Sequence, residues 1–330
     1  MNVIYLLPSI VKEGEHDMSK HGRTTLAWPF AIMLTLVTAV TPALGQPAPS
    51  QTSLWVISQG EEQVYLGGTI HLLRNSDYPL PAPFEEAYDR ADELYFETDL
   101  GTINSPAFQQ QVMAQLTYQD GRSLSTVLNE EAYSALQSYV NDSGLPIPMP
   151  MLESFKPGLL ISTLSVLEMQ KLGFTPQGVD AYFFTRAIGD GKERGQLESI
   201  EEQLAMLSRM GEGYESDYVL YSLADFEQLE DELENIVNHW RRGSTDSLSN
   251  DFIGPMREQS EVLYQELLVD RNNNWIPQIE AMFNDDDTEL VLVGVAHMLG
   301  EDGLLTALSS RGYEVTQYTV NENGAAGEEE

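Results

Sequence analysis

The sequence predicts an α/β (α+β) fold in which a mixed central sheet carries a long, mainly helical middle insertion. Short β-type runs lie near both ends of the chain, at 54–57, 64–66 and 290–293. The last run is continuous and apolar, as expected of a central strand buried on both faces. Between the ends, residues 105–284 show apolar residues at helical spacings. A chain of 330 residues that is 42% apolar can fill a substantial core.

The first elements follow from turn and proline signals. The runs 54–57 and 64–66 flank the polar turn Gln59–Glu62, which predicts a hairpin. Pro81 and Pro83 then introduce a helix near residues 84–91. A strand at residues 93–97 follows and ends on Glu97. We therefore expect Glu97 to emerge at a sheet edge.

The later elements alternate in the same way. Residues 226–237 place Leu and Ile at helical spacing among acids, which predicts an amphipathic helix with a solvated acidic face. After the apolar run 290–293, a helix at 303–311 and a strand at 313–318 are expected. These elements would complete the sheet.

The first 45 residues are predicted to be a cleaved signal peptide. Lys20 and Arg23 precede the mostly apolar run Leu26–Val40, which is shorter than the ~20 apolar residues of a spanning helix. Residues 1–17 are too acidic for the basic start of such a segment, so Met18 is a candidate true start. We expect a periplasmic or secreted protein with no stable membrane insertion after cleavage.

The remaining chain divides into three parts. Residues 46–52 are rich in Pro, Ser and Gln and predict a linker. Residues 53–319 form the predicted folded domain. Residues 320–330 are rich in Gly, Ala and Glu and predict a disordered acidic tail.

Charge and cysteine content narrow the function classes. The chain has 17 Lys and Arg against 52 Asp and Glu, a formal net charge of -35 that would repel nucleic acid. It has no cysteine, which excludes disulfides, thiolate metal sites and thiol nucleophiles. Any metal must therefore be held by His, carboxylate and water.

Two Gly-x-x-His sequences stand out. Gly68 to His71 and Gly294 to His297 each follow β-type residues, and ligand sites of open α/β sheets lie at the carboxyl ends of strands. Glycine permits close backbone approach there. His71 and His297 are two of the three histidines outside the signal segment, the third being His239, which is expected to be structural near a helix end. We expect the two motifs to converge on one site.

A two-imidazole metal site needs another ligand or a base. Glu97 is the first candidate because it would emerge at the same sheet edge, although helix capping or pairing with an Arg is the structural alternative. Asp99, Glu301 and Asp302 are weaker candidates.

At this point the chain resembles the TraB/GumN family, related to the Tiki metalloproteases, over about residues 53–319. The resemblance is carried by an early Leu-Trp hairpin, the two Gly-x-x-His motifs and Glu97, together with Lys156-Pro157, Gly178-Val179-Asp180, Leu197-Glu198, Arg271-Asn272 before Trp275, and Asp302-Gly303-Leu304. It implies a divalent-cation-dependent hydrolase, a peptidase in the Tiki branch. His71, His297 and Glu97 match functional positions, Arg271 matches a basic residue near the site, and Asp180 and Glu198 are second-tier site candidates.

The expected mechanism is activation of water. A divalent ion on His71 and His297, with Glu97 as third ligand or general base, would polarise a carbonyl and lower the pKa of bound water. Mn, Co and Zn all remain open. Arg271 is either an oxyanion donor or part of an ion pair at a helix start. The expected substrate is a peptide or small molecule.

Two alternatives remain open from the sequence. One is metal-free, esterase-like hydrolysis in which a histidine is the general base and Glu97 orients it. The other is a periplasmic protein that binds or sequesters a ligand without turnover. The helical middle would form a cleft over the strand ends in either case.

Overall fold

The computed structural model describes residues 51–103, 105–226, 228–284 and 286–320, and it confirms the predicted mixed α/β fold. The predicted signal segment and residues 321–330 of the predicted tail lie outside the described residues. The main sheet has six strands in the order β6-β4-β7-β2-β1-β8. Their bounds are β1 (Gln51–Gln59), β2 (Glu62–Thr69), β4 (Glu93–Phe96), β6 (Glu193–Gln196), β7 (Glu289–Gly294) and β8 (Glu314–Thr319). β1 thus begins inside the predicted linker.

The predicted hairpin is confirmed. β1 and β2 are antiparallel, with Leu54 opposite Gly67 and Gln59 opposite Glu62. Gly60 in the turn has a φ of 69°, which glycine adopts without strain. β8 adds to the free edge of β1, also antiparallel.

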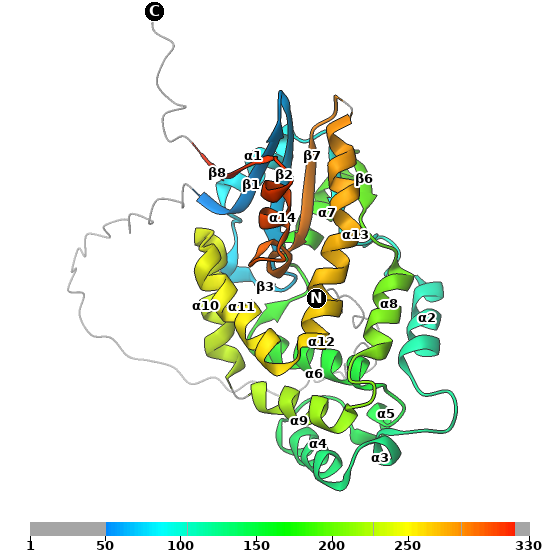
Figure 1. Ribbon diagram of the computed structural model, residues 1–330. Helices are drawn as coiled ribbons and strands as arrows, with labels where there is room; N and C mark the ends of the chain where they lie inside the picture. The colour runs from blue at the N-terminus through cyan, green and yellow to red at the C-terminus, as the bar shows by residue number, and fades with distance from the viewer. Residues whose placement is uncertain (1–50, 104, 227, 285, 321–330) are drawn as a thin grey trace, which may run out of the picture.

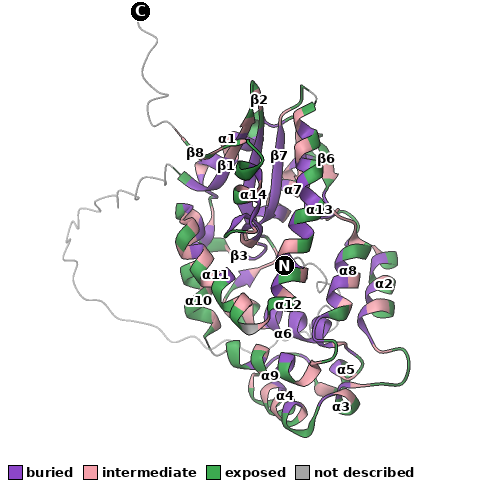
Figure 2. Ribbon diagram, in the orientation of Figure 1, coloured by how far each residue is buried: buried purple, intermediate pink, exposed green. Residues whose placement is uncertain are grey.

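The other half of the sheet is parallel. β7 pairs with β2 on one side and with β4 on the other, and β4 pairs with β6. All six residues of β7 are buried, as Figure 2 shows, which explains its continuous apolar run. β2, β4, β6 and β7 therefore end at one edge of the sheet.

β6 was not predicted. Its sequence, Glu-Arg-Gly-Gln at residues 193–196, has no apolar residue, and only the pairing with β4 shows that it is a strand. A polar strand suits the exposed edge of a sheet. A second, two-stranded sheet of β3 (Leu73–Arg74) and β5 (Phe174–Thr175) was also missed, because each strand has only two residues.

The predicted helical middle is confirmed. Figure 1 shows it on the side of the sheet where the parallel strands end, with α13 running back beside β7. Its helices are α2 (Pro106–Leu116), α3 (Leu124–Val127), α4 (Glu130–Asp142), α5 (Met149–Leu152), α6 (Pro157–Lys171), α7 (Val179–Asp190), α8 (Ile200–Arg209), α9 (Glu215–Asp225), α10 (Leu229–Arg242), α11 (Thr245–Gln259), α12 (Glu261–Tyr264) and α13 (Asp270–Ala281).

The helices expected at either end of this insertion are also present, as α1 (Ala82–Arg90) and α14 (Leu304–Ser310). In the described ranges, no helix combines the length and the hydropathy needed to cross a bilayer.

α10 is fixed to the sheet by its last turn. Trp240 is fully buried, and its indole Nε1 donates to the carbonyl oxygen of Gly68 at 2.7 Å. The backbone carbonyl of Trp240 accepts a hydrogen bond from the hydroxyl of Ser53 in β1 at 2.9 Å. These contacts hold α10 beside the end of β2, where the first Gly-x-x-His motif begins.

Candidate active site

The two Gly-x-x-His motifs lie side by side at the carboxyl ends of neighbouring parallel strands. Thr69 at the end of β2 is opposite Gly294 at the end of β7. On the other side of β7, Phe96 of β4 is opposite Leu292, so Glu97 emerges next to the second motif. Strand pairing thus brings together residues that are more than 190 positions apart.

His71 is buried and oriented by a carboxylate. Its Nδ1 donates to Oδ2 of Asp180 at 2.8 Å, and Oδ1 of Asp180 accepts from the Thr69 hydroxyl at 2.8 Å. Asp180 lies in the first turn of α7. A Cβ on Gly178 would lie 2.2 Å from the His71 carbonyl carbon, so glycine is needed for α7 to approach this closely. With Nδ1 donating, neutral His71 carries its lone pair on Nε2.

Glu97 is only 1% exposed and has both carboxylate oxygens engaged. Oε1 accepts from the backbone N–H of Gly294 at 2.6 Å and lies 3.9 Å from Nε2 of His71. Oε2 accepts from Nη2 of Arg271 at 2.5 Å. Burial is the largest single influence and would raise the pKa of Glu97, but nearby positive charges, of which Arg271 is the largest, together lower it. Glu97 is therefore a carboxylate in the folded protein.

Arg271 uses all five of its N–H groups within the protein. Nε and Nη2 bind both oxygens of Glu198, at 3.0 and 2.7 Å, and the second hydrogen of Nη2 goes to Glu97. Nη1 donates to the carbonyl of Leu267 at 3.1 Å and to Nε2 of His297 at 2.9 Å. This accounts for every donor of a guanidinium. Of the two predicted roles, the ion pair is therefore the one the geometry displays.

Glu198 reaches Arg271 because β6 extends the parallel edge. The residue follows β6, and its backbone N–H donates to the carbonyl of Glu97 at 2.9 Å. Burial raises the pKa of Glu198, and the negative charge of Glu97 acts in the same direction. Arg271 opposes both effects and holds the two carboxylates together.

His297 is held as a neutral imidazole. Asn272 donates through Nδ2 to the carbonyls of His297 and Asp302, at 3.2 and 2.9 Å, so its Oδ1 is the acceptor for Nδ1–H of His297 at 2.7 Å. The Nε2 lone pair then accepts from Arg271. Burial, followed by the charge of Arg271, lowers the pKa of His297 well below its ordinary value. The Trp275 ring lies 4.4 Å from the imidazole and covers it.

The predicted metal ligands fit a divalent cation in part. Two metal bonds of about 2.1 Å span at most about 4.2 Å, and Nε2 of His71 lies 3.9 Å from Oε1 of Glu97. A Cβ on Gly294 would lie 3.1 Å from Oε1 of Glu97 and 3.4 Å from Nε2 of His71, so the missing side chain leaves a space between these two ligands. His297 does not join them, because its Nε2 accepts from Arg271.

In the described part of the chain, no three His, Asp or Glu side chains are grouped closely enough to hold a metal ion. A complete two-histidine, one-carboxylate site would require Arg271 to release His297. His71 and Glu97 are the pair whose spacing fits a shared cation.

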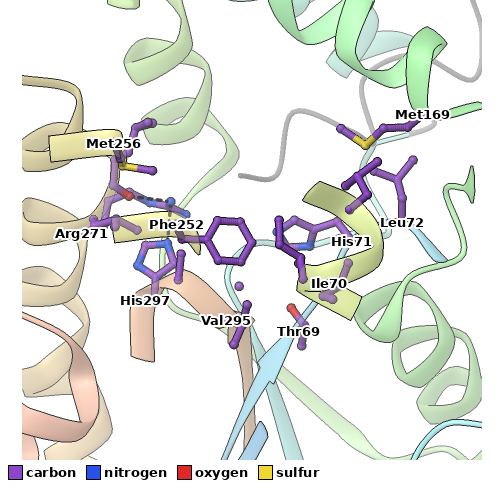
Figure 3. A pocket seen from close by; sticks show the side chains of 16 residues that line it. Thr69, Ile70, His71, Leu72, Met169, Phe252, Met256, Arg271, Val295 and His297 are labelled. Atoms are coloured by element: carbon purple, nitrogen blue, oxygen red, sulfur yellow. Dashed lines mark hydrogen bonds between the residues drawn. The ribbon is translucent and has the colours of Figure 1, made fainter. Parts of the chain in front are cut away.

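A largely apolar cavity of about 260 Å³ reaches His71, Gly294, Arg271 and His297, whereas Glu97 lies behind them and does not line it. His71 and Thr69 lie on one side of it and Arg271 and His297 on another, and Figure 3 shows Phe252 between the two imidazoles in this view. A molecule entering the cavity would meet the histidines of both motifs directly.

The other candidates lie outside this arrangement, each with a partner of its own. Oδ1 of Asp99 accepts from the backbone of Gly101 at 2.8 Å, Glu301 pairs with Arg257 at 2.7 Å, Asp302 accepts from the Tyr264 hydroxyl at 2.9 Å, and His239 pairs with Asp251 at 2.7 Å. None of the four lines the cavity.

Sequence reasoning gave no site role to Asn272 or Trp275. Both belong to α13 and face His297 one helical turn apart, a spacing that also fits an ordinary core helix. The run Arg271-Asn272 before Trp275 was the available signal. Nothing in the spacing of α10 and α11 indicated that their apolar residues line the site.

Comparison with known proteins finds one family model and several related sequences. The model of the TraB/PrgY/gumN family matches residues 53–317. Uncharacterized protein YbaP of Escherichia coli K12 is 27% identical over 250 residues, covering 74% of this chain and 87% of YbaP.

Two relatives from Danio rerio are described as metalloproteases. TIKI2 is 24% identical over 307 residues, covering 76% of this chain and 57% of TIKI2. TIKI1 is 23% identical over 320 residues, covering 79% of this chain and 62% of TIKI1. The matched region is thus less than two thirds of each metalloprotease. No solved structure matches the chain.

Proposed function

Because the chain belongs to the TraB/PrgY/gumN family, we propose that it is a divalent-cation-dependent hydrolase of peptide bonds, with its site at the shared carboxyl edge of β2, β7 and β4. The observation that carries the proposal is the pair formed by Nε2 of His71 and Oε1 of Glu97, 3.9 Å apart across the space left by Gly294. The distant TIKI metalloproteases support the reaction class.

The charges of the site favour a cation. Glu97, Glu198 and Asp180 are largely buried carboxylates, and Arg271 is the guanidinium that contacts two of them. When all three acids are ionised, negative charge exceeds positive charge by two. Buried charge of this kind is costly unless it is compensated. A divalent cation between His71 and Glu97 would offset the excess.

In this proposal the residues of the chain have distinct tasks. His71 and Glu97 would hold the cation, which when bound polarises a scissile carbonyl and lowers the pKa of bound water. Asp180 keeps Nε2 of His71 as the lone-pair nitrogen. Arg271 is a positioning residue that fixes Glu97 and His297. The surrounding apolar residues exclude bulk water, which strengthens electrostatic interactions inside the cavity.

The His71–Asp180 pair also favours a second candidate, metal-free hydrolysis. A carboxylate on Nδ1 is the arrangement that orients a histidine general base. In that case Nε2 of His71 would accept the proton of the attacking water.

The test begins with a peptide library and protein stripped of metal by chelation. We expect no cleavage until Mn, Co or Zn is restored, and a metal content near one ion per chain by plasma mass spectrometry. His71→Ala should abolish cleavage and metal retention. His239→Ala is the matched control, because this histidine also pairs with an aspartate but lies away from the cavity.

Other outcomes decide between the readings. Full activity in the metal-free sample would contradict the cation and favour His71 as general base. Peptide binding without turnover in every metal condition would contradict hydrolysis and favour a binding protein. The exported location expected from residues 1–45 stays a prediction, which N-terminal sequencing of the mature protein would test.

A further inference from the structure

The cavity over the site has an apolar wall that the mechanism does not use. We call the apolar wall the side chains of Leu233 and Ile236 on α10, Phe252 and Met256 on α11, and Leu267 and Leu268 before α13. Figure 3 shows Phe252 and Met256 reaching over the site from α11. The wall comes from the helical insertion, whereas the reactive groups come mainly from the strand ends.

Polar groups line only the part of the cavity next to the motifs. They belong to Thr69, His71, Arg271 and His297, and no Asp, Glu or Lys lines the cavity. The Thr69 hydroxyl donates to Asp180, and the N–H groups of Arg271 are all engaged. A charged side chain placed against the apolar wall would lose its hydrating water and find no polar partner there, so its burial would be unfavourable. An apolar substituent would gain from burial.

The size of the cavity limits what it holds. Its volume is about 260 Å³, below the roughly 300–1,000 Å³ of pockets that enclose a whole drug-sized ligand. It suits one large side chain rather than an extended segment. The hydrogen bond from Trp240 to Gly68 holds α10, and with it one side of the apolar wall, in a fixed position relative to β2.

We propose that the cavity is a specificity pocket that takes one uncharged, aliphatic or aromatic side chain of the peptide substrate, next to the bond that is cleaved. Phe252 and Met256 determine which side chains fit. This inference rests on the proposed function, because it names the substrate class of the same site. The net negative charge of the chain would not produce the same selectivity. Net charge would disfavour only acidic peptides, whereas the apolar wall disfavours basic side chains as well.

The experiment uses fluorogenic peptides that differ at one position, which carries Leu, Phe, Asp or Lys. We expect cleavage of the Leu and Phe peptides to exceed that of the Asp and Lys peptides by roughly tenfold or more in kcat/KM. Met256→Lys should lower cleavage of the Leu peptide and raise that of the Asp peptide. Met113→Lys is the matched control, because Met113 is 47% exposed on α2 and the charge change is the same.

Phe252→Ala provides a second variant that adds no charge. It enlarges the cavity and should shift preference from Leu toward Phe. Thermal unfolding by circular dichroism identifies any variant that fails to fold. Equal cleavage of all four peptides by the wild type, or an identical shift in Met256→Lys and Met113→Lys, would overturn the pocket.

Binding separates this inference from the proposed function. Fluorescence anisotropy of the labelled peptides is measured with His71→Ala, which the proposed function expects to be inactive. Preferential binding of the Leu and Phe peptides, lost in the His71→Ala, Met256→Lys double variant, supports the pocket even if the wild type cleaves nothing. Cleavage without any such preference would support the proposed hydrolase function and contradict the specificity pocket.

Discussion

Asp180 and His71, 109 positions apart, form a buried hydrogen bond of 2.8 Å that fixes which imidazole nitrogen faces Glu97. The bond depends on the close approach of α7 to the loop after β2. There, the backbone N–H of Val179 donates to the carbonyl of Ile70 at 3.0 Å. The orientation of His71 is therefore set by the fold of the insertion as well as by the strand.

Asp180→Asn should lower peptide cleavage by about 10–100-fold, because a neutral amide is a weaker acceptor for Nδ1–H and holds the imidazole less firmly in this orientation. Steady-state kinetics checks this. Asp251→Asn is the matched control, since Asp251 makes the same kind of bond with His239. Equal losses in the two variants would contradict a positioning role for Asp180.

Much of the sheet could be predicted because its signals are local. The alternating hairpin, the buried run of β7 and the helix behind Pro81 and Pro83 each depend on neighbouring residues. The placement of Glu97 beside the two motifs followed from one further rule, that parallel strands end at a common edge.

The remainder depends on tertiary contacts. β6 is recognisable only through β4, and Asn272 resembles any polar helical residue until His297 lies opposite it. The sequence leaves two roles open for Arg271, oxyanion donor and ion pair. Its N–H groups are all engaged, but this becomes visible only when the fold brings Glu97, Glu198, His297 and Leu267 around it. Partners distant in sequence leave no periodic signal.

Arg271→Gln should lower the free energy of unfolding by about 3–5 kcal/mol, because it leaves the buried carboxylates of Glu97 and Glu198 without the guanidinium that pairs with them. Urea unfolding followed by circular dichroism measures the change. Arg271→Lys should recover only part of the loss, since an ammonium keeps the charge but not the forked geometry. The control is Arg122→Gln, at an exposed pair with Asp120, which should unfold at the wild-type urea concentration. An unchanged midpoint for Arg271→Gln would refute this account of the cluster.

Added divalent cation should raise the melting temperature of the metal-free protein. An ion present at 100 times its dissociation constant stabilises the folded state by about 2.7 kcal/mol. Differential scanning fluorimetry with Mn, Co and Zn measures the shift. His71→Ala should lose it, whereas His239→Ala should keep it. A shift of equal size in both variants would indicate binding to the acidic surface instead of the site.

Gly294→Ala tests the space between His71 and Glu97 with one methyl group. The backbone of Gly294, with φ −52° and ψ 133°, is accessible to alanine, so no conformational strain is added. The new Cβ would lie 3.1 Å from Oε1 of Glu97 and 3.4 Å from Nε2 of His71, where the cation is proposed to lie. We therefore expect loss of metal retention and cleavage while the protein stays folded.

The control for Gly294→Ala is Gly189→Ala in α7, where an added Cβ meets nothing within 4 Å. It should leave cleavage unchanged and stabilise the helix by about 0.5–1 kcal/mol. Metal content by plasma mass spectrometry and kcat/KM are measured for both variants. A Gly294→Ala protein that retains metal and activity would show that the space is not used, and the cation would then have to lie elsewhere along the strand ends.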